Sequence, residues 1–118
     1  MTTWKRWLDP VLIKVDGEQH TVPLSNCGVK TVTALFELLS QKFEPPLNIR
    51  ALQGHLQARG LRAWGSYLNS DLSCLHSLGV IELVWDGRQK LIKPLFSEAR
   101  IVTTEHSGFF VEVTLKHG

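Results

Sequence analysis

Four side chains suited to contact with a polyanion lie within "VWDGRQKLIKP", residues 84–94: Trp85, Arg88, Lys90 and Lys93. Arginine and lysine bond to phosphate oxygens, and such a group at a hairpin tip suits phosphate or minor-groove contact with nucleic acid. The alternative is a cation–π pair on an ordinary charged edge that discourages aggregation.

The dipeptide Asp86-Gly87 predicts that this segment is a β-hairpin, because it tolerates the positive φ angles of a tight turn. A two-residue turn formed by Asp86-Gly87 would place Trp85 opposite Arg88 and Leu83 opposite Lys90. The charged and aromatic side chains would then share the tip of the hairpin.

The preceding segment, "SYLNSDLSCLHSLG" (residues 66–79), predicts an amphipathic helix over 66–78. Leu68, Leu72 and Leu75 form one edge of this helix, with Leu78 at the margin of that edge. The opposite side is small and polar, and its candidate DNA-contacting residues are Ser66, Tyr67, Asn69, Ser70 and Ser73, with Ser77 on the same side. Such side chains permit a close approach and bond to phosphates or base edges in the major groove. The helix carries no Arg or Lys, so a solvated face remains an alternative.

The connection "GLRAWG", residues 60–65, adds one further candidate. Arg62 lies near the N-terminal end of the helix that is expected to face phosphate, and a cation at that position could bond to a phosphate oxygen. We expect Leu61 to enter the core and Trp64 to serve packing rather than function.

Three helices are expected before the hairpin that ends at Pro94. The first is predicted over 29–43, the second over 48–59 with Asn48 as its N-cap and Gly60 as its C-terminal cap, and the third over 66–78. The first helix also has a weak apolar strip on its outer side, formed by Thr31, Ala34 and Leu38.

Two further hairpins are expected at the ends of the chain. "VLIKVDGEQHTVPL", residues 11–24, should turn at Asp16-Gly17, and "ARIVTTEHSGFFVEVTLK", residues 99–116, should turn at His106-Ser107-Gly108. The fold class is therefore α+β. We expect a single domain over 1–118, with an N-terminal hairpin at 10–25, a core at 29–94 and a C-terminal hairpin at 98–117.

The core at 29–94 resembles the winged helix-turn-helix superfamily. The resemblance is carried by "NIRALQGHLQARG", by "SYLNSDLSCLHSLGVIEL" and by the hairpin, which would be the wing. It implies a DNA-binding fold and, in many members, a dimer on a two-fold DNA site. The connection at 60–65 is longer than the three or four residues usual in that motif.

The terminal hairpins leave the oligomeric state open. Strict alternation over Phe109–Leu115 predicts a strand that would pair across a two-fold axis in a homodimer if it were exposed. An intramolecular sheet that closes over the first helix is the alternative.

Neither a metal site nor an enzyme is expected from the motifs. The histidines, at His20, His55, His76, His106 and His117, have no metal-ligand spacing, and Cys74 and His76 point about 200° apart on a helix. There is no nucleophile elbow and no Gly-rich phosphate loop. The two cysteines, Cys27 and Cys74, are expected to be reduced thiols. We expect no cofactor.

Charge and composition fit a globular protein of mildly basic character. The chain has 118 residues with a formal net charge of +2, and its first ten residues lack the apolar region of a secretory signal. We therefore expect a cytoplasmic or nucleoid-associated protein that does not enter a membrane. The expected function is non-enzymatic binding of double-stranded DNA, as a small regulator of transcription or of replicon maintenance. The alternative is a winged-helix module that binds another protein or serves as a subunit of a larger complex.

Overall fold

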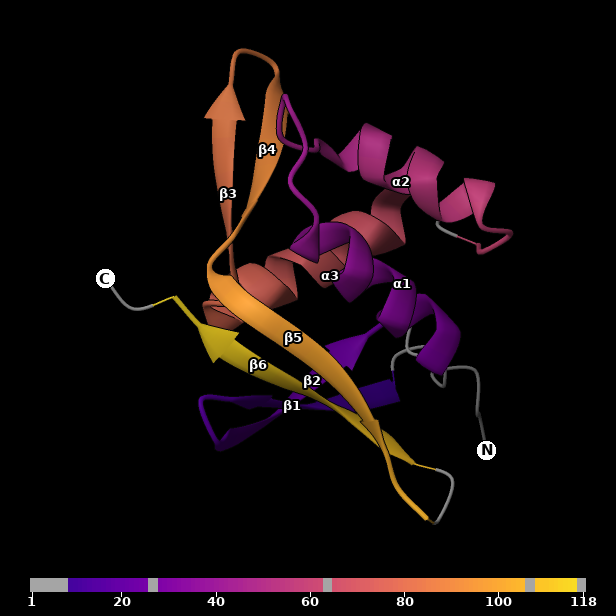
Figure 1. Cartoon of the computed structure of the whole chain (residues 1–118). Coiled ribbons are helices and arrows are strands. Elements are labelled where there is room, and N and C mark those ends of the chain that lie inside the picture. Colours follow the sequence, from indigo (N-terminus) through magenta and orange to yellow (C-terminus); the bar gives the residue numbers. More distant parts are fainter. Residues whose placement is uncertain (1–8, 26–27, 63–64, 106–107, 117–118) are drawn as a thin grey trace, which may run out of the picture.

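The computed structural model describes residues 9–25, 28–62, 65–105 and 108–116. The described elements are β1 (Asp9–Val15), β2 (Glu18–Leu24), α1 (Val29–Ser40), α2 (Ile49–Ala58), α3 (Gly65–Leu78), β3 (Ile81–Asp86), β4 (Gln89–Pro94), β5 (Phe96–Thr103) and β6 (Phe109–Leu115). This is the α+β class expected from the sequence, with three helices followed by the β3–β4 hairpin (Figure 1).

The terminal segments form the two hairpins that their alternation predicts. β1 pairs with β2 around Asp16 and Gly17, whose φ angles of 51° and 87° are the two positive values of a type I′ turn. β5 pairs with β6, and the backbone N–H of Thr104 donates to the carbonyl of Gly108 to close that loop. The predicted turn residues His106 and Ser107 lie outside the described residues.

These two hairpins join into one four-stranded sheet in the order β2-β1-β6-β5. β1 and β6 run parallel, with Ile13 opposite Val111 and Val15 opposite Val113. β6 is therefore an interior strand with both edges paired, so the expectation that it would pair with a second copy of the chain is wrong. The hydrogen bonds that a partner would have used are already made to β1 and β5. The intramolecular sheet, the alternative drawn from the sequence, is what forms.

The helices end where local capping signals place them, except at the end of α1. Asn48 caps α2 by accepting from the Ala51 N–H at 2.7 Å, and Gly60 follows α2 with a φ of 77°. α1 was expected to reach residue 43, but it ends at Ser40. The backbone of Gln41 turns to an extended conformation there, and this leaves Phe43 half-buried in the following loop.

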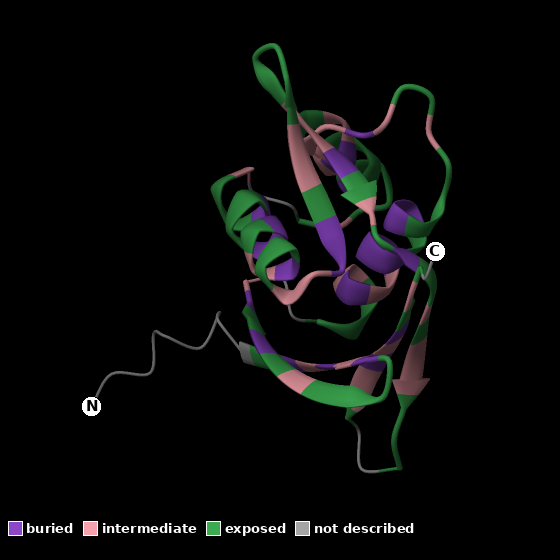
Figure 2. Cartoon of the chain, turned by 90° about the vertical axis from the view of Figure 1, so that its left-hand side faces the viewer, coloured by how far each residue is buried: buried purple, intermediate pink, exposed green. Residues whose placement is uncertain are grey.

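α1 is buried on nearly all sides because it lies between the sheet and the other helices (Figures 1 and 2). Ala34 and Leu38 are buried, so the strip on which they lie is not an outer surface as expected. The inner face of the sheet covers one part of the helix, and α2 and the base of the β3–β4 hairpin cover another, while Lys30, Glu37 and Ser40 remain exposed. Buried apolar residues from all nine described elements form one cluster.

The β3–β4 hairpin projects from this body, and its tip is exposed (Figure 2). Asp86 pairs with Gln89, so the two-residue turn is Gly87-Arg88 and not Asp86-Gly87. Gly87 has a φ of 66°, whereas the φ of Arg88 is not positive. This pattern is typical of a type II′ turn. Asp86 thus remains in the ladder, and each residue of β3 pairs with a β4 residue two positions later than expected.

This shift changes the neighbours expected near the tip. Trp85 lies opposite Lys90 rather than Arg88, and Leu83 lies opposite Ile92 rather than Lys90. Arg88 lies in the turn itself. Trp85 and Lys90 share a face with the buried Ile92, and alternation along the strands puts Asp86 on the other face.

Candidate functional site

The exposed side of α3 is polar, as the helical pattern predicts. Leu68, Leu72 and Leu75 are buried and Leu78 is half-buried. The predicted contact residues Ser66, Tyr67, Asn69, Ser70 and Ser73 are all exposed. The helix ends in a Schellman arrangement, in which Gly79 has a φ of 92° and the Val80 N–H donates to the Leu75 carbonyl. This cap turns the chain directly into β3.

Asp71 is the buried exception on α3, with an exposed fraction of 1%. Its carboxylate accepts a 2.7 Å hydrogen bond from the backbone N–H of Ser25, at the end of β2. A charged acceptor compensates the burial of that N–H and ties the helix to the sheet. No role for Asp71 was predicted from the sequence. Its position between Leu68 and Leu72, on the apolar side of the helix, could have indicated that it is buried.

The exposed polar side of α3 divides between two grooves. Ser70, Ser73 and Ser77 line a shallow groove against β2, where Thr21 and Pro23 form the opposite wall. Asn69 faces the other way, toward the β3–β4 hairpin. The serines therefore lie beside the sheet edge, and only part of the helix surface is continuous with the hairpin.

The second groove, called here the hairpin groove, lies between the β3–β4 hairpin, the start of α2 and α3. It has a volume of about 530 Å³. Its lining residues are Asn48, Ile49, Arg50, Asn69, Trp85, Arg88, Gln89 and Lys90. Three are cations and, among the residues that the structure describes, none that lines this groove is acidic.

The contacts at the hairpin tip hold the aromatic and basic groups together. The Lys90 ammonium lies over the Trp85 ring, 5.1 Å from the ring centroid. Trp85 still has 65% of its surface exposed, which is high for a tryptophan. The pair is thus a cation above an accessible apolar surface at the edge of the groove.

Asn48 fixes the start of α2 against the hairpin. Besides capping the helix, its side-chain amide donates to the Gln89 side chain, and its backbone forms a bridge with Leu91. The neighbouring Ile92 N–H donates to the Leu47 carbonyl at 2.7 Å. This arrangement brings Arg50, in the first turn of α2, to the hairpin groove.

Four of the ten predicted contact residues therefore come together in the hairpin groove: Asn69, Trp85, Arg88 and Lys90. Arg50, Asn48 and Gln89 were missed as site residues, although Arg50 contributes to the basic excess of 46–94. No local pattern marks them, because their approach to the hairpin depends on how α2 packs.

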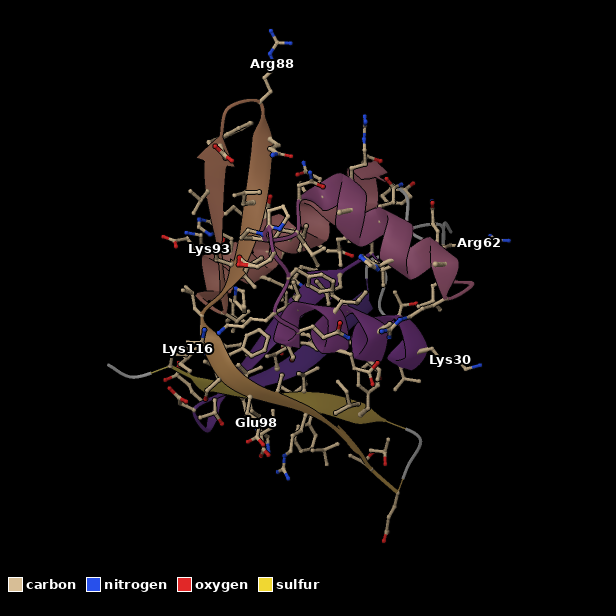
Figure 3. The ribbon with its side chains drawn as sticks, turned by 45° about the horizontal axis from the view of Figure 1, so that its top comes forward. Lys30, Arg62, Arg88, Lys93, Glu98 and Lys116 are labelled. Atoms are coloured by element: carbon tan, nitrogen blue, oxygen red, sulfur yellow. The ribbon has the colours of Figure 1, made fainter. Side chains whose placement is uncertain are left out.

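Two predicted cations lie elsewhere (Figure 3). Arg62 is exposed at the far end of α2, well away from Arg88 at the tip of the hairpin. Lys93 lies near the hairpin base, in a different pocket that it shares with Lys116. Leu61 packs against the core as expected, whereas Trp64 lies outside the described residues.

The described residues give no sign of a metal centre or of a helix that crosses a bilayer. No three His, Cys, Asp or Glu side chains within the described ranges lie close enough together to hold an ion. Cys74 is a half-buried free thiol, and Cys27 lies outside the described residues. None of the helices in the described part of the chain has the length and apolar character that a membrane span requires.

Comparison with known proteins gave no match to a protein-family model, to a curated protein or to a solved structure. The functional argument therefore depends on the geometry of the chain itself.

Proposed function

We propose that this protein binds double-stranded DNA through the β3–β4 hairpin and the exposed side of α3, without catalysing a reaction. The observation that carries the proposal is the hairpin groove, where Arg50, Arg88 and Lys90 lie with an exposed tryptophan and three amide side chains. Cations bind phosphates and amides bind base edges, so the groove offers both kinds of contact.

The arrangement of the elements agrees with this role. Three helices lead directly into a projecting hairpin, the order on which the resemblance to winged helix-turn-helix proteins depends. We propose that the hairpin is the wing, and that Arg88 at its tip reaches phosphate or the minor groove. Asn69, Ser66 and Tyr67 would face the major groove near it. On this basis we propose a small regulator of transcription or of replicon maintenance that works in the cytoplasm or nucleoid.

A salt-dependent titration on duplex DNA tests the proposal. Three phosphate contacts, from Arg50, Arg88 and Lys90, would give a slope of about −2.7 in log K against log salt. Affinity would then fall about fortyfold between 50 and 200 mM salt. Fluorescence anisotropy with a labelled duplex measures both quantities.

Single variants locate the contacts. Arg50→Gln, Arg88→Gln and Lys90→Gln should each reduce the magnitude of the slope by about 0.9, because each removes one neutralised phosphate. Lys30→Gln is the matched control, since Lys30 is an exposed cation on α1, far from the hairpin tip (Figure 3). A salt slope that is unchanged in all three variants would refute the assignment.

A second candidate is a protein-binding module, and one observation favours it. Trp85 and Tyr67 are exposed by 65% and 43%, and α3 carries no Lys or Arg along its length. Exposed aromatic residues are enriched at the centres of protein interfaces. This candidate takes precedence if the protein shows no affinity for duplex at 50 mM salt.

A further inference from the structure

A separate pocket lies at the base of the β3–β4 hairpin and shares no lining residue with the hairpin groove. Its volume is about 330 Å³. It is formed by the end of α1, the connection to α2, the end of β4 and the residue that follows β6. Its lining residues are Leu38, Leu39, Gln41, Lys42, Phe43, Glu44, Pro46, Leu47, Ile92, Lys93, Pro94 and Lys116. We call it the lysine pocket.

The interior of the lysine pocket is apolar. Leu38, Leu39, Leu47 and Ile92 are core residues, and Phe43 is half-buried beside them. The pocket exists because α1 ends at Ser40, so the following residues leave the helix and pass over its end. The hydrogen bond from Ile92 to Leu47 then holds that connection against β4.

The rim of the lysine pocket is positively charged. Lys42, Lys93 and Lys116 come from three segments that are distant in the sequence, and all three are exposed. Lys93 and Lys116 lie on the same side of the molecule (Figure 3). Glu44 is the one acidic residue among the lining residues that the structure describes, so the rim carries a net charge of +2 (three Lys minus one Glu).

An apolar interior below a cationic rim is complementary to a molecule with an apolar body and one anionic end. Ligand sites in proteins combine mainly apolar walls with a few polar groups that fix orientation. The pocket volume of about 330 Å³ lies at the lower end of the range for small-molecule sites, about 300–1,000 Å³. A medium-chain carboxylic acid is a small molecule with the required apolar body and anionic end.

We propose that the lysine pocket binds a small organic carboxylate, whose apolar body enters between α1 and β4 and whose carboxylate faces the three lysines. The proposal does not depend on DNA binding, because none of the three lysines belongs to the hairpin groove. It also assigns a ligand-binding role to Lys93 in place of the DNA contact expected from the sequence.

Octanoate, which has ten non-hydrogen atoms, is the probe. Titration of the whole protein, followed through the methyl NMR signals of Leu38, Leu39, Leu47 and Ile92, should show saturable shifts at these methyls. 1-Octanol has the same chain without the charge and should bind more weakly. Equal binding of octanol, shifts confined to other methyls, or no shifts at millimolar octanoate would overturn the proposal.

Charge variants test the rim. Lys93→Gln and Lys116→Gln should each weaken octanoate binding by up to about fivefold, as expected for partly solvated ion pairs, and should leave octanol binding unchanged. Lys30→Gln makes the same charge change at a site outside the pocket and should alter neither. These titrations contain no DNA, so their failure is distinct from failure of the proposed DNA binding. Octanoate affinity that does not change in the Lys93→Gln/Lys116→Gln double variant would refute the role of the lysines.

Discussion

Lys90 and Trp85 face each other across the β3–β4 hairpin, with the ammonium group 5.1 Å from the centroid of the indole ring. The pair places a cation and an exposed aromatic surface on the side of the hairpin that faces α2 and α3. In the proposed complex with DNA, the contribution of Lys90 to the affinity should therefore depend on the salt concentration, whereas that of Trp85 should not.

We predict that Lys90→Ala weakens binding to every duplex and reduces the magnitude of the salt slope by about 0.9, because a phosphate contact is lost. Trp85→Ala should weaken binding by a similar factor at 50 and 200 mM salt, because it removes apolar contact but no charge. Anisotropy titrations at the two salt concentrations measure both effects. A reduced slope in Trp85→Ala would show that the ring acts only by placing Lys90.

The polar side of α3 should affect choice between sequences more than total affinity. We predict that Asn69→Ala reduces the preference between duplex sites, by about 1–3 kcal/mol if Asn69 makes a bidentate base contact. Ser70→Ala should have a smaller effect, since Ser70 faces the groove beside β2. Competition between randomised duplexes gives the preference. Identical preferences in wild type and Asn69→Ala would show that Asn69 makes no base contact.

Asn48 both caps α2 and bonds to Gln89 of the β3–β4 hairpin, and two variants separate these roles. Asn48→Ala should lower the free energy of unfolding by about 1 kcal/mol, because the Ala51 N–H loses its acceptor. Asn48→Ser keeps a cap but is too short to bond to Gln89, so we expect near-normal stability. If the link to Gln89 positions the groove, both variants should weaken duplex binding. Urea denaturation and anisotropy test the two parts.

Asp71 should be the polar residue on α3 that matters most for stability. We predict that Asp71→Ala lowers the free energy of unfolding by about 1.5–3 kcal/mol, because it removes a charged acceptor and leaves the Ser25 N–H unsatisfied. Asp86→Ala, on the exposed hairpin, is the matched control and should change stability by less than about 0.5 kcal/mol. Chemical denaturation of the two variants provides the comparison. Equal stabilities would show that the buried carboxylate is not a structural link.

A pH effect is expected from the outer face of the sheet. The guanidinium of Arg100 hydrogen-bonds to Glu112 and lies close to its charge, which lowers the pKa of Glu112 from its ordinary value of 4.5. A carboxyl with a lowered pKa in the folded state stabilises that state above its unfolded pKa, and the contribution is lost as pH falls below about 4.5 through the folded pKa. Glu112→Gln should therefore melt at a slightly lower temperature than wild type at pH 7, and at the same temperature at pH 2. Persistence of the difference at pH 2 would contradict the assignment.

The sequence predicted most of the local structure because the signals are short-range. Leucines at helical spacing in α3, alternating residues in β6, and glycines after α2 and α3 identified each element close to its observed bounds. The exposed candidate residues on α3 were predicted for the same reason, since a helix has only one side opposite its buried leucines. The end of α1 was placed three residues too late, because Phe43 continues the apolar spacing after the helix itself has ended.

Only the tertiary structure decided which distant elements meet. The parallel pairing of β1 with β6 joins residues about a hundred positions apart, and no local pattern encodes it. That pairing occupied the strand that had been expected to form a dimer. The hairpin turn lies one residue later than expected and so moves each cross-strand partner by two positions, which puts Lys90 rather than Arg88 opposite Trp85, because register depends on the turn. The packing of α2 against β4 brought Arg50 into the hairpin groove, and the early end of α1 opened the pocket beside Lys93. Residue types and periodicity thus determined which side chains are available, whereas long-range packing decided which of them share a site.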